Sequence, residues 1–265
     1  MVSYRDLASG LKKLEIDTAQ PVIIHASLSA FGEIRGGADS FLGALLATFQ
    51  KVMMPSFTFK TMVTPEFGPD NNGVIYGSGK DINKMAEFFY PDMSVDPLIG
   101  DLAEALLQHP DSQRSNHPIL SFSGINIPEI LKSQNLMSPF EPIRAMMGEN
   151  GWVILAGVDH TVNTSIHYAE QLAGRKTFTR WALTIHGVTE CPNFPGCSDG
   201  FNKAQDWFSS FTKTVRIGNT KIMALPITNV VQTVKTRVQK DPKALLCSRK
   251  ECPRCDAVRQ SLKKK

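Results

Sequence analysis

Apolar residues recur along this chain in two patterns, one typical of helices and the other of buried strands. Apolar positions three or four residues apart predict amphipathic helices, whereas short apolar runs rich in β-branched residues predict buried strands. The predicted helices cover residues 3–15, 39–49, 98–108, 127–133, 163–173, 203–211 and 227–239. The predicted strands cover residues 21–26, 51–56, 119–122, 152–158 and 178–186, and residues 214–224 form a predicted hairpin that turns at Gly218-Asn219.

The order of these elements predicts the fold class. A strand, a loop of small residues, a helix and a second strand follow one another over residues 21–56, and such a unit favours a parallel sheet covered by helices. We therefore expect an α/β fold whose central sheet is mixed or mostly parallel and has helices on both faces. The sequence contains no internal repeat and no low-complexity linker, so residues 1–265 are expected to form a single domain.

Residues 60–95 interrupt this order with an irregular stretch rich in proline and glycine. A loop of this length inside a compact domain is usually functional or forms a lid. We expect it to be an insertion near a binding site.

Composition narrows the classes of protein that the chain can belong to. It has 265 residues, of which 42% are hydrophobic and 20% charged, enough for a substantial core. It lacks a long apolar segment and a secretory leader, so we expect a cytoplasmic protein with no membrane partner. The net charge is +4, but Lys263–Lys265 contribute much of it, so no nucleic-acid partner is expected. A monomer or homodimer is expected.

One histidine occupies a position that suits a general base. The run from Gly151 to Glu170 predicts a buried strand, a short polar loop and the first turn of a helix that carries His167. The positive end of the helix dipole disfavours the imidazolium form, and a general base must be neutral at neutral pH. The alternative is a half-buried histidine that only packs within a helix.

Two polar loops could bind an anion. In His25-Ala-Ser-Leu-Ser-Ala-Phe-Gly32, small residues between a strand and a helix allow backbone N–H groups to approach a phosphate. In Arg114-Ser-Asn-His-Pro-Ile-Leu-Ser121, an arginine, hydroxyls and a histidine precede a strand. Neither loop has a P-loop or dinucleotide-binding pattern. The alternatives are an ordinary tight loop and a loop whose polar groups satisfy their own backbone.

Taken together, these segments resemble a known family, the aminoglycoside 3-N-acetyltransferases. The matching stretches occur in the family's order between about residue 20 and residue 175, and the last third of the chain matches only loosely. They are His25-Ala-Ser-Leu-Ser-Ala-Phe-Gly32, Met54-Pro-Ser-Phe-Thr58, Gly100-Asp-Leu-Ala-Glu104, Arg114-Ser-Asn-His-Pro118 and Thr164-Ser-Ile-His-Tyr-Ala-Glu170.

The resemblance implies an acyltransferase that uses acetyl-CoA as cosubstrate, with the distinctive α/β fold of that family. It implies that His167 is the catalytic base, and we take Asp199 as the candidate for its supporting carboxylate. It also implies that Ser27, Leu28 and Ser29 lie against the cofactor's pyrophosphate. The complete set of candidate cofactor-binding residues is Ser27, Leu28, Ser29, Phe31, Arg114 and Ser115.

All five cysteines lie after residue 190, three of them in a Cys- and Lys-rich tail over residues 247–265. A Cys-x-x-Cys pair together with two further cysteines can complete a tetrahedral zinc site. The expected ligands of this structural zinc are Cys191, Cys197, Cys252 and Cys255. The alternative is a set of free or redox-active thiols.

The expected reaction is acetyl transfer from acetyl-CoA to a primary amine, and the 3-amino group of an aminoglycoside is one candidate. Aminoglycosides are polycations that call for an acidic site. This chain is net basic, and the insertion over residues 60–95, which we expect near the acceptor site, carries only scattered acids. The acceptor, and with it a role in antibiotic resistance, therefore stays open. The alternative function is a catalytically silent sensor with the same fold that binds CoA or a metal.

Overall fold

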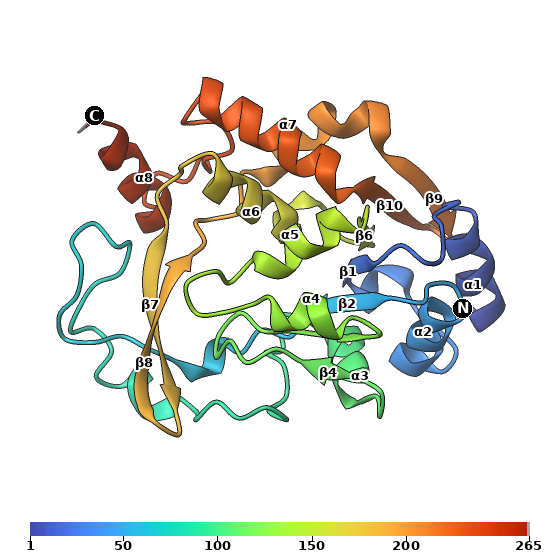
Figure 1. The fold of residues 1–265 in the computed structure, drawn as a ribbon, viewed down its shortest axis with the longest axis horizontal. Coiled ribbons are helices and arrows are strands. Elements are labelled where there is room, and N and C mark those ends of the chain that lie inside the picture. The colour runs from blue at the N-terminus through green and yellow to red at the C-terminus, as the bar shows by residue number, and fades with distance from the viewer. Residues whose placement is uncertain (264–265) are drawn as a thin grey trace.

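The computed structural model describes residues 1–263 and is built around a seven-stranded mixed sheet (Figure 1). The strand order is β4-β5-β2-β1-β6-β10-β9. The three central strands, β2 (Val52–Pro55), β1 (Val22–Ala26) and β6 (Trp152–Ala156), run parallel. The outer strands pair antiparallel: β4 (Gln113–Arg114), β5 (Phe122–Ile125), β10 (Thr220–Pro226) and β9 (Lys213–Ile217).

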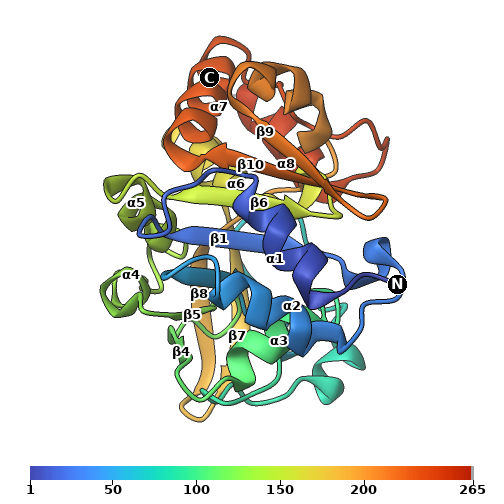
Figure 2. The same cartoon turned by 90° about the vertical axis from the view of Figure 1, so that its right-hand side faces the viewer.

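Helices cover both faces of this sheet, as the sequence predicts. Successive residues of a strand point to opposite faces, so Ile24 packs with one hydrophobic cluster and Ile23 with the other. The first cluster includes residues of α1 (Tyr4–Lys12), α2 (Gly37–Leu46) and α3 (Asp101–Gln108), which lie in front of the strands in Figure 2. The second cluster includes residues of α4 (Pro128–Lys132), α5 (Glu141–Gly148), α6 (Thr164–Leu172) and α7 (Ile227–Lys240).

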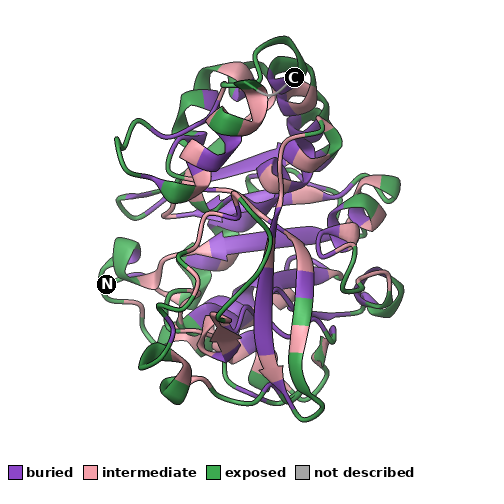
Figure 3. Ribbon diagram, turned by 90° about the vertical axis from the view of Figure 1, so that its left-hand side faces the viewer, coloured by how far each residue is buried: buried purple, intermediate pink, exposed green. Residues whose placement is uncertain are grey.

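A second, smaller sheet stands beside the first. It has the order β3-β7-β8 and is antiparallel, with β3 (Met62–Val63), β7 (Phe178–Thr184) and β8 (Gly187–Phe194). Residues 60–95 supply β3 and the 3₁₀ helix η3 (Ile82–Met85), and the 3₁₀ helix η2 (Phe59–Thr61) overlaps their start. Figure 3 shows buried residues along β7 and a mixture of burial classes along β8. The sequence does not predict β8, because few of its positions are buried enough to give an apolar alternation.

The remaining differences from the predicted elements are local. The strand expected at 119–122 begins only at Phe122, because the His117 ring accepts hydrogen bonds from the backbone N–H groups of Ile119 and Leu120 and holds them in a turn. The expected helix 203–211 is the 3₁₀ helix η5 (Phe201–Phe211). The 3₁₀ helices η1 (Leu28–Phe31) and η4 (His160–Val162) and the helix α8 (Pro253–Lys263) complete the elements.

The hairpin predicted at Gly218-Asn219 is confirmed as β9–β10. Within residues 1–263, no helix combines the length and the apolar character that crossing a bilayer requires. Of the predicted tail, Lys264 and Lys265 lie outside the described residues.

Candidate active site

A cavity of about 840 Å³ opens beyond the carboxyl ends of the parallel strands. Its lining includes Ser27 after β1, Phe57 after β2 and Val158 after β6. Ligands in open α/β sheets bind at this edge, because loops and helix N-termini converge there. The small sheet adds a further part of the lining through Arg180 and Phe194.

His167 lies in the lining of this cavity, on the first turns of α6. The helix begins where the Asn163 side chain accepts a hydrogen bond from the backbone N–H of Ser165, at 3.1 Å. The imidazole packs between two aromatic rings, with centroid distances of 6.0 Å to Phe140 and 4.7 Å to Phe201. Its side chain is 13% exposed, so packing fixes the ring while leaving part of it accessible.

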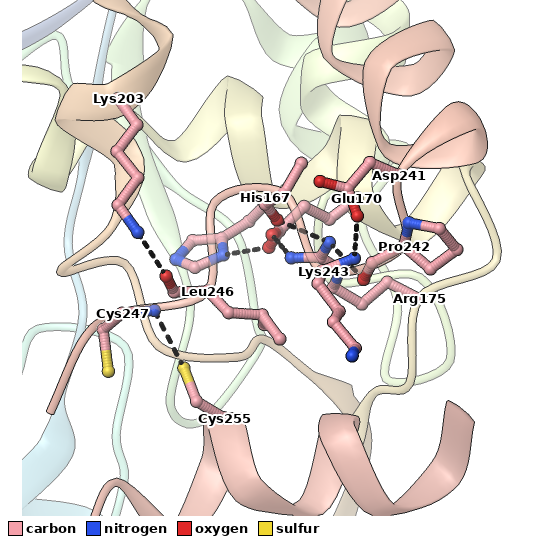
Figure 4. A network of polar contacts seen from close by, with 11 residues as sticks. His167, Glu170, Arg175, Lys203, Asp241, Pro242, Lys243, Leu246, Cys247 and Cys255 are labelled. Carbon is pink, nitrogen blue, oxygen red and sulfur yellow. Dashed lines mark hydrogen bonds and ion pairs between the residues drawn. The ribbon is translucent and has the colours of Figure 1, made fainter. Parts of the chain in front are cut away.

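A buried carboxylate stands behind the ring. The Oε2 atom of Glu170 lies 3.5 Å from Nδ1 of His167, and the Oε1 atom of Glu170 accepts a 2.5 Å hydrogen bond from Nη1 of Arg175. Arg175 also donates from Nη2 to the carbonyl oxygens of Pro242, at 3.0 Å, and Ala244, at 2.7 Å (Figure 4). Within residues 1–263, Nδ1 is buried and lies at ion-pair distance from Glu170 without an aligned hydrogen bond, so we assign Nε2 to a substrate.

The structure places a carboxylate other than Asp199 beside His167. Asp199 forms an ion pair with Arg249 at 2.6 Å, and half of its side chain is exposed. The carboxylate beside His167 belongs to Glu170, three residues further along the same helix. Residues at positions i and i+3 of a helix lie on one face, so this spacing was the signal that could have identified it.

The predicted anion loop contributes to the same cavity. Ser27, Leu28 and Ser29 are among its lining residues, and the hydroxyl oxygens of Ser27 and Ser29 are 2.9 Å apart. The first turn of α3, from Gly100 to Ala103, also lines it. The first backbone N–H groups of a helix point outward and favour an anion. A second cavity of about 630 Å³ shares Ser27 with the first and adds Lys221.

Three of the expected cofactor-binding residues, Phe31, Arg114 and Ser115, are not among the lining residues of either cavity. Phe31 is buried in the core, where its ring packs edge-on against Phe41 at 5.1 Å. The guanidinium of Arg114 bonds the carbonyl oxygens of Ser56, Pro91 and Met93, and so ties the insertion to β2. The Ser115 hydroxyl bonds the backbone of Phe122. Each of these side chains therefore packs in the core or hydrogen-bonds to the backbone, whereas the sequence analysis expects it to contact the cofactor.

A comparison with protein families settles the relationship that this geometry suggests. The family model for aminoglycoside 3-N-acetyltransferases matches residues 23–239. The chain belongs to this family. The match includes His167, Glu170 and the Ser27–Ser29 loop, and it ends before the tail begins.

Curated proteins related to this family member are only distantly similar to it. A prophage-derived aminoglycoside N(3')-acetyltransferase-like protein, YokD of Bacillus subtilis, is 27% identical over 193 residues, which cover 68% of this chain and 70% of YokD. Aminoglycoside N(3)-acetyltransferase III from Salmonella is 24% identical over 185 residues, or 65% of this chain and 62% of that enzyme. The match thus spans less than two thirds of that enzyme's length.

Solved structures of the family share the fold over nearly the whole chain. The apoenzyme of aminoglycoside acetyltransferase AAC(3)-IVa superposes with a TM-score of 0.80, at 23% identity and with 98% of each chain covered. The YokD structure superposes with a TM-score of 0.78, at 21% identity, covering 91% of this chain and 100% of YokD. The α/β fold with a mixed central sheet is therefore confirmed.

The cavity of this family member is lined by more positively than negatively charged side chains. The charged residues of its lining are Asp101, Arg180 and Arg254. The Arg180 guanidinium donates to the carbonyl oxygens of Asn72 and Thr179, at 3.1 and 2.7 Å, and both of these partners are neutral. Burial, together with the charge of Arg254, lowers the pKa of Arg180 to about 10, so it stays protonated at neutral pH.

Two other histidines of the family motifs are buried and neutral. Burial lowers the pKa of His25 to about 3, and its Nε2 lies 3.3 Å from the hydroxyl of Thr164, a cavity residue. Burial lowers the pKa of His117 to about 4, and its Nδ1 accepts the two backbone hydrogen bonds that shape the turn before β5. His117 therefore supports the fold rather than the cavity.

The cysteines form a cluster with one member different from the expected set. Cys197, Cys247, Cys252 and Cys255 are buried, and their Sγ atoms all lie within 4.8 Å of one another. Cys191 is part of β8, where it pairs with Arg180 of β7, and Cys247 takes its place in the cluster. Within residues 1–263, none of the five cysteines forms a disulfide.

Proposed function

We propose that this protein is an acetyl-CoA-dependent N-acetyltransferase that acetylates a primary amine, with His167 as the general base. The observation that carries the proposal is His167 in the cavity lining with Glu170 behind it at 3.5 Å. The anion loop in the same cavity and membership of the family support the same reaction.

The arrangement suits proton removal from an attacking amine. An amine is protonated at neutral pH, and His167 accepts a proton through Nε2 as the nitrogen approaches the thioester carbonyl. The new C–N bond forms, the C–S bond breaks, and the departing thiolate takes up the second proton that the nitrogen loses. The imidazolium releases the first proton to solvent, so that the products are an amide, the CoA thiol and one proton. Glu170 keeps a proton on Nδ1 and stabilises the imidazolium, while Arg175 holds Glu170 in place.

We assign the pyrophosphate of acetyl-CoA to the loop of Ser27, Leu28 and Ser29, which lines the cavity. The first turn of α3 faces the same cavity and supplies further N–H groups for an anion. Lys221 of the adjoining cavity offers a positive charge to the remaining phosphate. A structure of a family relative, AAC-IIIb, contains CoASH, which supports this choice of cosubstrate.

Two classes of acceptor amine compete. Structures of the relative AAC(3)-IVa contain the polycations gentamicin and apramycin, which favours the 3-amino group of an aminoglycoside. The cavity of this chain, however, sets two arginines, Arg180 and Arg254, against the single carboxylate Asp101. Such a site repels a polycation and favours an amine that also carries an anionic group.

Release of free CoA with a panel of amines tests the proposed reaction. Gentamicin, apramycin and a matched pair of amino sugars with and without a phosphate ester are incubated with acetyl-CoA and the protein. CoA release with at least one amine, matched by the acetylated product in a mass spectrum, is the expected result. Tight binding of acetyl-CoA without turnover of any amine would instead favour the silent sensor.

The charge of Arg254 is expected to separate the two acceptor classes. If the acceptor is anionic, Arg254→Gln removes a charged hydrogen bond and lowers kcat/KM about 10- to 100-fold, whereas Arg254→Lys retains most of the activity. Turnover of gentamicin should not fall in Arg254→Gln. Steady-state kinetics with both amines measure this, and an equal loss with both would place Arg254 on acetyl-CoA instead.

A further inference from the structure

Four cysteines from two distant parts of the chain meet in one buried cluster. Cys197 follows β8, whereas Cys247, Cys252 and Cys255 belong to the tail, with Cys255 in the first turn of α8. Each is at most 5% exposed. Packing of apolar side chains alone would not select four cysteines from separate segments for one buried position. The cluster therefore indicates a role for the thiols themselves.

The spacing of the sulfur atoms fits a single tetrahedral ion. Zn–S bonds of about 2.3 Å place the four thiolates of a tetrahedral site about 3.8 Å apart. The four Sγ atoms of the cluster lie within 4.8 Å of one another, which a small contraction converts into that geometry. Disulfides would draw the sulfurs together in pairs and do not require all four to be close. The Cys252-Pro-Arg-Cys255 spacing is that of a zinc knuckle.

The surroundings of the cluster suit thiolates. The backbone N–H of Cys247 donates to Sγ of Cys255 at 3.4 Å (Figure 4). Nη2 of Arg249 lies 3.6 Å from Sγ of Cys197 and 3.8 Å from Sγ of Cys252. Four thiolates around a divalent ion keep an excess of negative charge, and these donors offset it.

The cluster adjoins the cavity on one side. Cys197 stands between Gly196 and Ser198, and Arg254 lies between two of the cysteines; all three of these neighbours line the cavity. Nη1 of Arg254 donates to the carbonyl oxygen of Gly196 at 3.0 Å, which joins the two segments. The insertion rests on the same unit, because the Asn71 amide donates to the carbonyl oxygen of Ala257 in α8 at 2.9 Å.

The cluster also adjoins the segment that holds Arg175, and through it Glu170, beside His167. The segment just before Cys247 supplies the carbonyl oxygens of Pro242 and Ala244 to Arg175, which holds Glu170. Nζ of Lys203 donates to the carbonyl oxygen of Leu246 at 2.8 Å, next to the cluster (Figure 4). An ion bound by Cys247 therefore fixes the end of the segment that positions Arg175.

We propose that Cys197, Cys247, Cys252 and Cys255 bind one Zn²⁺ in a structural site that fastens the tail to the cavity wall. Four thiolates fill the tetrahedral sphere and leave no position for a substrate, so the ion holds segments together and takes no part in acetyl transfer. Cys191 lies outside the site.

Metal content of the whole chain tests this proposal independently of activity. Protein purified with a reductant and without chelators is expected to contain about one zinc per chain by elemental analysis. Cys247→Ser should contain far less, whereas Cys191→Ser, a matched change of another buried cysteine, should keep the full content. If Cys247→Ser fails to fold, wild-type protein reconstituted with Co²⁺ serves instead, because a cobalt tetrathiolate has intense visible and sulfur-to-metal absorption bands.

Removal of the ion should also lower stability. A strong chelator added to the wild-type protein is expected to lower Tm, and added zinc should restore it. Wild-type protein with no zinc and five titratable thiols would overturn the proposal, as would stoichiometric iron in its place. Loss of zinc from Cys191→Ser and not from Cys247→Ser would overturn the ligand set.

Discussion

Replacement of His167 by alanine is expected to lower kcat/KM for acetyl transfer by about 10²- to 10⁴-fold, the contribution typical of a positioned general base. His167 is the cavity histidine with a carboxylate behind it, whereas the buried His25 has its accessible nitrogen at a threonine hydroxyl. The loss should appear in kcat with little change in KM for acetyl-CoA, because the anion loop that would hold the cosubstrate is unchanged. The loss of kcat is measured by detecting the released CoA thiol in a stopped or continuous assay.

A different histidine, which lies at the surface, provides the control for this prediction. His186 lies in the exposed turn between β7 and β8, and His186→Ala should leave kcat/KM unchanged. The Tm of His167→Ala must stay close to that of the wild-type protein for the kinetic loss to be meaningful. Wild-type rates in a folded His167→Ala would exclude His167 as the base.

The central sheet can be predicted from the sequence because its signal is local. Strands such as β1 and β6 are buried on both faces, so their apolar residues are consecutive and stand out from the flanking loops. The start of the helix that carries His167 also has a local signal, because the Asn163 side chain caps it by accepting the backbone N–H of Ser165. β8 is not predictable, because most of its residues are exposed or only half-buried and no apolar alternation marks it.

The site depends on contacts that no local pattern encodes. Arg114 matches a family motif that predicts it at the cofactor, yet its guanidinium satisfies the carbonyl oxygens of Pro91 and Met93, which the insertion brings to it. The cysteine cluster shows the same effect. Cys191 is close to Cys197 in sequence, but strand pairing carries it away, and Cys247 arrives from the tail. Glu170 is the exception, since helical spacing alone places it beside His167.

Glu170→Gln is expected to lower kcat by about 10²-fold or more, because a neutral amide neither stabilises the imidazolium nor selects the tautomer with its proton on Nδ1. Glu170 is a positioning residue in this account, and it acts through His167. Its loss also leaves Arg175, a side chain only 4% exposed, without its carboxylate. Breaking a buried pair in this way costs about 3–5 kcal/mol, so a clear fall in Tm should accompany the kinetic change.

A double-mutant cycle separates these two effects. If Glu170 acts through the imidazole, Glu170→Gln has almost no further effect on kcat when His167 is already alanine, whereas its effect on Tm persists. A purely structural role predicts the opposite, namely the same fractional loss of kcat in both backgrounds. Glu149→Gln supplies the control, because Glu149 pairs with Lys51 at the surface and its loss should change the free energy of unfolding by less than about 1 kcal/mol. Additive losses of kcat would therefore assign Glu170 to the fold, and non-additive losses would assign the His167–Glu170 pair to the reaction.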